Sequence, residues 1–462
     1  MKKTIALLLI CLIAGLADYA LAAQKVMTVY QRAAGDEAEP HSITGINDFA
    51  APVGTGVTVD KPNALIRLGG GTANTEGAAW YGGDSDAGYC VNGICNFGIG
   101  IRAYFEFRFL NVDSSVDSTA YGNGFTFAII NGSNNVKTDR GGSPAGNVWP
   151  ALMAYAGPGN DTINYLGLQP PKMAIEFDTY PNTNAATTCD TAAHINNNRN
   201  DANNNNHLAL MLWGSNPATA CSTGTAVTYD DNRHGAGNGK TDISYPSNSA
   251  NGDGTGDGLS DGTGGYYAGP TVTWLEDNVV HLFRIEVIRG ATVNASGTDY
   301  NYKVKAWVDC AGCTAAQLAA FKDTSIPYPP TPTGLAPQIN RLIALSTALH
   351  TTGAANFNTM LFGFTQATGA LAQAQNIEIK NFVIYFPPCA SDVPPGGGWT
   401  YCADENGTCT FSGTKLVAYG LNCFYNYLNA TTSIGCDNAT FGSGNATAGD
   451  PLYGVVKKCY YK

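Results

Sequence analysis

Charged residues are scarce in this chain: only 13% of its 462 residues are Asp, Glu, Lys or Arg. Low charge, together with 55 glycines, is typical of short β-strands joined by long polar loops and argues against a helix bundle. A basic surface is also lacking, because the formal net charge is −11. This excess of acid argues against nucleic acid as a partner.

Catalytic and membrane signatures are missing as well. No Gly-x-Ser-x-Gly elbow and no Walker-type loop stands in a strand–helix setting, so neither a Ser-His-Asp nor a Cys-His nucleophile is indicated. After the first residues, no stretch is long and apolar enough to cross a membrane. We therefore expect no transmembrane segment in the mature chain.

Residues 1–22 have the pattern of a secretory signal peptide. Lys2 and Lys3 give a basic start, and residues 5–16 form an apolar run that is too short to span a bilayer. Ala20-Leu21-Ala22 is a small-residue cleavage site. An uncleaved anchor is the alternative interpretation. We expect a secreted or cell-surface protein, and the opening residues are typical of bacterial signals.

The cysteines agree with export. Of 13 cysteines, Cys11 lies in the signal, which leaves an even number in the mature chain. An even number with near-neighbour spacing predicts disulfides. The clusters are Cys90 with Cys95, Cys189 with Cys221, Cys310 with Cys313, and six cysteines from Cys389 to Cys459. Metal binding by Cys310 and Cys313 is the alternative, but no second Cys or His pair lies near them in the sequence.

The stretch Met173–Asn182 alternates as a strand does, so that Glu176 and Asp178 share one face. Two carboxylates followed by Tyr180 and Asn182 form an oxygen-rich cluster that suits Ca²⁺. The alternative is a strand with two solvated acids. Among the later acids, Asp253, Asp257, Asp261 and Glu276 are better interpreted as a solvated loop than as a second cation site.

Strand patterns recur along the chain with no alternation of strands and helices. They are residues 64–68, 77–81, 101–109, 122–130, 207–213, 281–288, 302–308, 360–364 and 376–386. Residues 315–322 are the one expected helix. The pattern predicts an all-β fold, with an antiparallel sandwich over residues 23–388.

Five segments follow one another in a recognisable order: Gly122–Phe127, Tyr165–Leu168, Ala174–Asn182, Asn206-His207 and Phe362–Gly369. In this order they resemble the legume-type (L-type) lectin domain, a concanavalin A-like jelly-roll sandwich. The resemblance extends over residues 40–387. It implies a non-catalytic protein that binds sugar beside two metal ions, Ca²⁺ and a transition metal such as Mn²⁺.

The resemblance also implies the metal ligands. Glu176 would bind the transition metal and Asp178 would bridge both ions. Tyr180 would give Ca²⁺ its backbone carbonyl, and Asn182 its side-chain oxygen.

Two further metal ligands follow from the family's downstream Asp and His. Asp201 and His207 match them best, although they lie six residues apart where the family has five and are displaced by an insertion. Asp190 and His194, inside the insertion, are rival ligands. The alternative for His207 is a strand-edge histidine with a hydrogen-bonded ring.

The sugar-contacting positions that the resemblance implies are Asn123, Gly167, Asn182, Gly369, Ala370 and Leu371. Asn123 stands where the family has Asp. Its amide donates as well as accepts hydrogen bonds, and the charged acceptor, usually the stronger partner, is lost. The sugar is therefore different or more weakly bound, or the site is vestigial.

Residues 389–462 differ from the rest of the chain in their high density of cysteines. Residues Pro394–Gly398 have the composition of a hinge and precede five of the six cysteines. Disulfides between these cysteines would stabilise a β-module that is too small for a large core. The favoured pairings are Cys402–Cys409, Cys436–Cys459 and Cys389–Cys423, although six cysteines allow about 15 combinations. The module is either a second glycan-binding unit or a stabilising attachment.

Three functions are therefore compared. The favoured one is a secreted, calcium-dependent carbohydrate-binding protein without catalytic activity, with a glycan as partner. The second is a structural or adhesive surface component that keeps the lectin fold as a scaffold, in a homo-oligomer or surface assembly. The third is a glycoside hydrolase. Some sandwich glucanases have Glu-x-Asp-x-x-Glu along one strand, and here no third acid follows Glu176 and Asp178 at that spacing.

Overall fold

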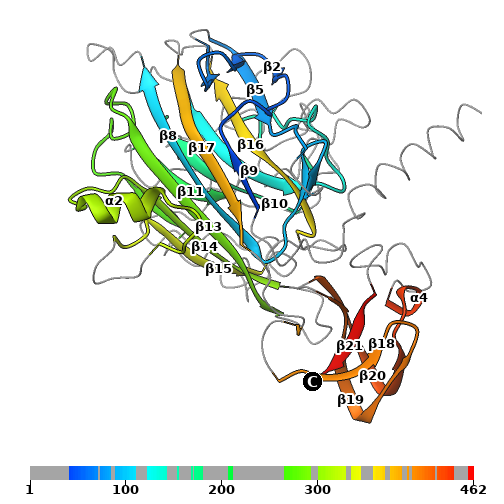
Figure 1. Ribbon diagram of the computed structural model, residues 1–462. Helices are drawn as coiled ribbons and strands as arrows, with labels where there is room; N and C mark the ends of the chain where they lie inside the picture. The colour runs from blue at the N-terminus through cyan, green and yellow to red at the C-terminus, as the bar shows by residue number, and fades with distance from the viewer. Residues whose placement is uncertain are drawn as a thin grey trace, which may run out of the picture.

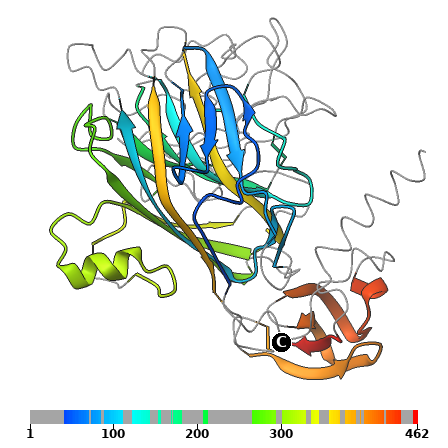
Figure 2. The same ribbon diagram turned by 45° about the horizontal axis from the view of Figure 1, so that its top comes forward.

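The computed structural model describes residues 41–70, 73–84, 89–110, 122–142, 153–155, 168–169, 171–180, 206–211, 265–292, 300–328, 335–344, 357–369, 375–387, 393–394, 398–421, 424–441 and 456–462. Two large sheets lie face to face, and a small third sheet lies beyond one end of them (Figure 1). The turned view in Figure 2 shows the same arrangement. The predicted signal peptide lies outside the described residues.

The first large sheet has eight strands, in the order β15-β14-β13-β8-β17-β4-β3 with β1 also paired to β17, and its recorded pairs are antiparallel. Its strands are β1 (His41–Thr44), β3 (Val57–Asp60), β4 (Leu65–Leu68), β8 (Gly100–Leu110), β13 (His281–Thr292), β14 (Tyr300–Val308), β15 (Ile339–Ala344) and β17 (Asn376–Phe386).

The second large sheet has nine strands, in the order β12-β11-β10-β9-β16-β5-β2, with β6 and β7 attached beside β16. Its strands are β2 (Val53–Gly54), β5 (Thr75–Trp80), β6 (Cys90–Val91), β7 (Ile94–Asn96), β9 (Gly124–Asn131), β10 (Lys172–Asp178), β11 (His207–Met211), β12 (Tyr266–Ala268) and β16 (Thr359–Thr368). Two facing antiparallel sheets confirm the predicted all-β sandwich.

Aromatic side chains from both sheets fill the space between them. Phe177 of β10 stacks on Phe125 of β9, with 4.2 Å between ring centroids and 4° between ring planes. Its ring also meets Phe107 and Phe283 of the facing sheet at 5.0 and 4.9 Å. Because all four rings are buried, their removal from water and their mutual packing hold β10 against the core.

A short helix covers part of the outer face of the eight-stranded sheet. It is α2 (Ala315–Lys322), and it begins with a capping box at Thr314. Arg284, which is fully buried on β13, donates to the carbonyl oxygens of Ala320 and Phe321 in the last turn. The predicted helix is confirmed. It is not the only one, because α4 (Asn438–Phe441) lies near the C-terminus.

The third sheet forms the C-terminal module, with four strands in the order β18-β21-β19-β20. They are β18 (Thr400–Asp404), β19 (Thr408–Leu421), β20 (Phe424–Gly435) and β21 (Lys458–Tyr461). Tyr425 and Tyr460 continue the buried cluster of the sandwich into this sheet, which also has a small core of its own. The boundary at residue 389 stays a prediction.

The structure tests part of the disulfide prediction. The expected pairs Cys90–Cys95, Cys310–Cys313, Cys402–Cys409 and Cys436–Cys459 are all formed. The expected pairs of Cys189 with Cys221 and of Cys389 with Cys423 lie outside the described residues. Among the helices that are described, none has both the length and the apolar character needed to cross a membrane.

Candidate metal and carbohydrate site

Three potential metal ligands converge on the outer face of the nine-stranded sheet. Glu176, Asp178 and His207 each direct one ligand atom so that these atoms lie within 4.8 Å of one another. The distance from His207 Nε2 is 3.9 Å to Glu176 Oε2 and 3.7 Å to Asp178 Oδ2. All three residues are buried, with relative exposures of 4%, 2% and 1%. The alternative of a strand with two solvated acids is therefore wrong.

Strand register brings these residues together. Asp178, the last residue of β10, pairs with His207, the first residue of β11, and also with Gly124, the first residue of β9. Gly124 pairs in turn with Ala367 of β16. One row thus crosses four strands at the same end of the sheet. Glu176 lies two residues before Asp178 on β10, and therefore on the same face of the strand.

The core side of β10 holds the carboxylates in place. Phe177 lies between Glu176 and Asp178 and points into the sandwich, so the two carboxylates must point outward. Gly124 has φ +107°, and a Cβ there would lie 1.9 Å from the carbonyl oxygen of Phe177. The close approach of β9 to β10 beside the site therefore requires glycine at this position.

The donor set fits a divalent cation. Ligand atoms that bind one transition-metal ion at about 2.0–2.2 Å lie about 3–4.3 Å apart, depending on the angle between them. The 3.7 and 3.9 Å distances from His207 Nε2 fall in this range. Asp178 Oδ1 accepts a hydrogen bond from the backbone N–H of Tyr180 at 2.7 Å, which orients Oδ2 toward the imidazole. Two carboxylates with an imidazole suit ions such as Mn²⁺ or Zn²⁺.

A third buried carboxyl group lies close to the start of β11. Glu276 accepts a hydrogen bond from the Asn206 side chain at 3.2 Å, and Asn206 directly precedes His207. Burial raises the pKa of Glu276 to about 8, against the opposing effect of the Asn206 hydrogen bond. The interpretation of Glu276 as part of a solvated loop is wrong, because only 2% of it is exposed. Nothing in the sequence pairs it with Asn206, 70 positions away.

The remaining predicted residues divide into two groups. Asn123 and Gly369 lie just beyond the row, Asn123 before β9 and Gly369 after β16. Asn123 is buried, and its backbone bonds with Ala367 and Thr179 hold it at that end of the sheet. The predicted residues outside the described part of the chain are Gly167, Asn182, Asp201, Ala370 and Leu371, and the rival ligands Asp190 and His194 lie there too.

A second cluster around a histidine lies at His281, and its carboxylates bind the imidazole directly. His281 lies between two aspartates, with Nδ1 2.8 Å from Asp309 Oδ2 and Nε2 3.1 Å from Asp277 Oδ1. Its ring stacks on Phe107 at 5.1 Å. Burial disfavours the charged imidazole, but the hydrogen bonds and charges of Asp309 and Asp277 outweigh it and raise the pKa of His281. Both ring nitrogens contact protein carboxylates, so this cluster is an ion-paired histidine.

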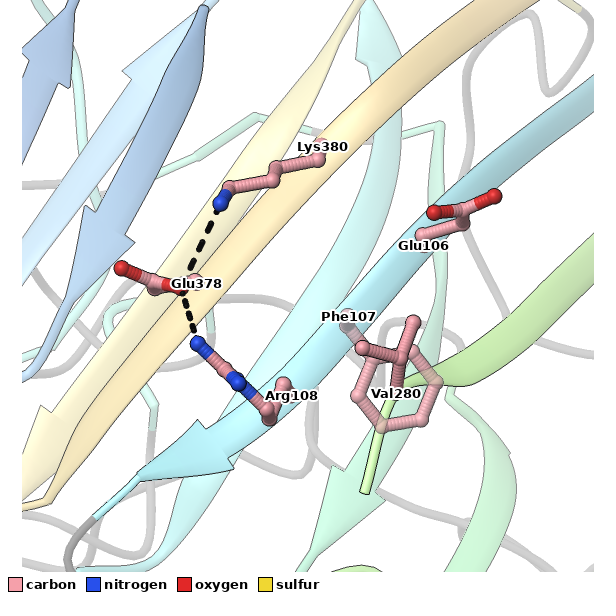
Figure 3. Close-up of a pocket in the computed structure, with 6 residues that line it drawn as sticks. All are labelled: Glu106, Phe107, Arg108, Val280, Glu378 and Lys380. Atoms are coloured by element: carbon pink, nitrogen blue, oxygen red, sulfur yellow. Dashed lines mark hydrogen bonds and ion pairs between the residues drawn. The ribbon is translucent and has the colours of Figure 1, made fainter. Parts of the chain in front are cut away.

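A shallow hollow of about 120 Å³ lies on the other large sheet, between β8 and β17 (Figure 3). Glu378 lies there between Arg108 and Lys380, at 2.9 and 3.6 Å. Glu106, also in the hollow, is bound by Lys322 at 3.0 Å. Because its carboxylates are engaged by cations of the protein, the hollow has the character of a surface ion-pair network.

Comparisons with known proteins return legume lectins and related proteins. Arcelin-5 from Phaseolus vulgaris is 8% identical with a TM-score of 0.32, and the match covers 75% of this chain and 97% of that one. Basic winged bean lectin with Tn-antigen is 13% identical with a TM-score of 0.32, and the match covers 75% of this chain and 98% of that one. Lectin I from Ulex europaeus with the methyl glycoside of α-L-fucose is 11% identical with a TM-score of 0.31, and the match covers 75% of this chain and 97% of that one.

No family profile and no curated protein sequence matches the chain. The matched structures are lectins and a lectin-like protein, which is the class that the five sequence motifs resemble. Their identities and TM-scores are low, so they carry no argument about what this chain binds. The case for a function rests on the motifs and on the geometry of the site.

Proposed function

We propose that this protein is a metal-dependent carbohydrate-binding protein whose site lies at the end of β9, β10, β11 and β16. The observation that carries the proposal is the buried cluster of Glu176, Asp178 and His207. Asp178 and His207 lie in one row with Gly124 and Ala367, close to Asn123 and Gly369 at the same end of the sheet. The sequence resemblance selects these positions without knowledge of the fold, and three of the proposed metal ligands come together in space.

The metal would act through position as well as charge. Asp178 and His207 are on neighbouring strands, and a shared ion would lock the ends of these strands together. Asn123 directly precedes the adjacent strand β9, so its side-chain amide would serve as a fixed hydrogen-bond donor and acceptor for a sugar hydroxyl. In this proposal the ion by His207 is a transition metal, and Ca²⁺ is held by Asp178 together with the Tyr180 carbonyl and Asn182.

The finer parts of the proposal are calcium dependence, secretion and the absence of catalysis. Secretion is supported by the pattern of residues 1–22 and by the four disulfides of the described residues, which fit an oxidising compartment. The absence of catalysis is supported by the sequence, in which no third acid follows Glu176 and Asp178 at the Glu-x-Asp-x-x-Glu spacing.

The deciding experiment is calorimetric titration of Mn²⁺ and Ca²⁺ into the metal-stripped protein, followed by a glycan array with and without a chelator. Asp178→Asn keeps the shape of the side chain and removes its charge. Glu378→Gln is the matched control, because Glu378 is a largely buried carboxylate on the other sheet. We expect Asp178→Asn to weaken metal binding at least tenfold, since ligand changes act directly on the ion.

Each outcome distinguishes the functions. Metal binding that Asp178→Asn alone removes, with glycan hits that the chelator abolishes, supports the proposal. Metal binding without glycan hits favours the structural or adhesive alternative. Absence of metal binding in the unmutated protein refutes the metal site. Release of reducing sugar that Glu176→Gln abolishes would instead indicate a glycoside hydrolase.

A further inference from the structure

Among the described disulfides, Cys310–Cys313 is the one in which neither cysteine is buried; in Cys402–Cys409 only Cys402 is partly exposed. Cys310 and Cys313 are three positions apart, between β14 and α2, and both are partly exposed. The two residues between them, Ala311 and Gly312, are exposed. By contrast, Cys90–Cys95, another short-range disulfide, has both cysteines fully buried. A thiol in solution therefore has access to Cys310 and Cys313 without unfolding of the sandwich.

A buried phenol lies beneath this disulfide. The hydroxyl of Tyr328 is 3.5 Å from Cys310 Sγ and 3.8 Å from Cys313 Sγ, within hydrogen-bond distance for sulfur. Only 3% of Tyr328 is exposed. Its ring packs edge-on against Trp307 and Phe321, at 5.5 and 5.2 Å between centroids. The hydroxyl is therefore held in one place, next to both sulfurs.

The surrounding backbone also favours a thiolate. Cys313 directly precedes Thr314, the N-cap of α2, so both cysteines lie at the positive end of that helix. The backbone N–H of Cys313 donates to the carbonyl of Cys310 at 3.0 Å, which keeps the turn closed without help from the sulfurs. The loop closed by this disulfide is very short, so opening it restores little freedom to an unfolded chain.

We propose that Cys310–Cys313 is a redox-active disulfide that exchanges with small-molecule thiols of the glutathione class, with Tyr328 as the positioning residue. A thiolate of the small molecule attacks one sulfur, forms a mixed disulfide, and expels the other cysteine as a thiolate. The Tyr328 hydroxyl donates a hydrogen bond to that leaving thiolate. A second small-molecule thiolate attacks the mixed disulfide and releases the oxidised small-molecule disulfide.

The reaction balances in electrons and protons. Two small-molecule thiols lose two electrons and two protons, and the two cysteines take up both to become thiols. The proposal does not rest on glycan or metal binding, because Cys310 and Cys313 adjoin the eight-stranded sheet and Glu176, Asp178 and His207 lie on the other.

The test is a redox titration of the folded, full-length protein in glutathione buffers. Free thiols are trapped by alkylation at each point and assigned to peptides by mass spectrometry. We expect Cys310 and Cys313 to become alkylated while Cys90–Cys95 and Cys436–Cys459 stay oxidised. The Cys90–Cys95 disulfide is the matched control, because it closes a similarly short loop but is buried. Reduction of all three together, only on unfolding, would overturn the proposal.

The role of Tyr328 has a separate test. Tyr328→Phe keeps the packed ring and removes only the hydroxyl. We expect it to slow reduction of Cys310–Cys313 by about threefold to tenfold, as for the loss of one hydrogen bond, and to move the pH profile of alkylation to higher pH. The thermal unfolding midpoint and the reduction of Cys90–Cys95 should not change. An unchanged rate and pH profile in the variant would refute the positioning role.

Discussion

Arg284 is the residue whose replacement gives the sharpest test of how the outer face of the sandwich is held together. Its guanidinium is fully buried and donates to the carbonyls of Ala320, Phe321 and Asp323 at 2.8 to 3.0 Å. It also forms an ion pair with buried Glu286 at 2.7 Å. One side chain from β13 thus binds the C-terminal end of α2 and neutralises a buried carboxylate.

Arg284→Met should lower the free energy of unfolding by about 3–5 kcal/mol, because it leaves Glu286 as a buried charge without its cation. The carbonyls at the end of α2 lose their donor at the same time, which adds to the loss. Glu286→Gln removes the buried charge, so adding it to Arg284→Met should cost less than the sum of the two single effects. We expect a coupling energy of about 2 kcal/mol.

The assay is urea unfolding with disulfides intact, followed by tryptophan fluorescence, together with hydrogen exchange of the α2 amides. Arg108→Met is the matched control, because its ion pair with Glu378 is partly exposed and should contribute less than about 1 kcal/mol. The reasoning fails if Arg284→Met costs no more than Arg108→Met, or if the effects of Arg284→Met and Glu286→Gln are additive.

Two further predictions concern glycine geometry and pH. Gly124→Ala forces a Cβ to within 1.9 Å of the Phe177 carbonyl, so we expect a loss of more than about 2 kcal/mol in urea unfolding and weaker Mn²⁺ binding by calorimetry. Gly413→Ala, also at positive φ but with no atom within 4 Å, should cost only about 1 kcal/mol; equal costs would contradict the argument. Because the pKa of His281 is raised above 6.5, its pairing with Asp309 stabilises the fold fully below pH 6.5, and this contribution is lost as pH rises through the folded-state pKa. His281→Gln should therefore be most destabilising at acid pH and least at alkaline pH in unfolding titrations, and a pH-independent effect would refute the assignment.

Local sequence patterns were sufficient to predict several strands, the helix α2 and four of the disulfides. Alternation along β10 placed Glu176 and Asp178 on one face and Phe177 on the other, because side chains of a strand alternate whatever the strand packs against. The helix expected over residues 315–322 has the bounds of α2, and the structure adds the capping box at Thr314 that fixes its start. Three disulfides join cysteines at most seven positions apart, and cysteines close in sequence stay close in space. The fourth, Cys436–Cys459, joins cysteines 23 positions apart and was a favoured pairing among several combinations.

Strands with weak patterns were missed. β3 is short, and β15 is an edge strand whose place depends on pairing with β14. Their assignment comes from backbone hydrogen bonds to a neighbouring strand, and such pairing is a property of the sheet. Sequence periodicity alone carries little of this information.

The sequence by itself determined which residues carry ligand chemistry and on which face of β10 they stand. Only the tertiary structure decided that His207 reaches Glu176 and Asp178, and that Glu276 is buried beside Asn206. The physical reason is that these contacts join separate strands and loops. Their distances depend on strand register and on the packing of two sheets, which are set by the whole core and by no single stretch of the chain.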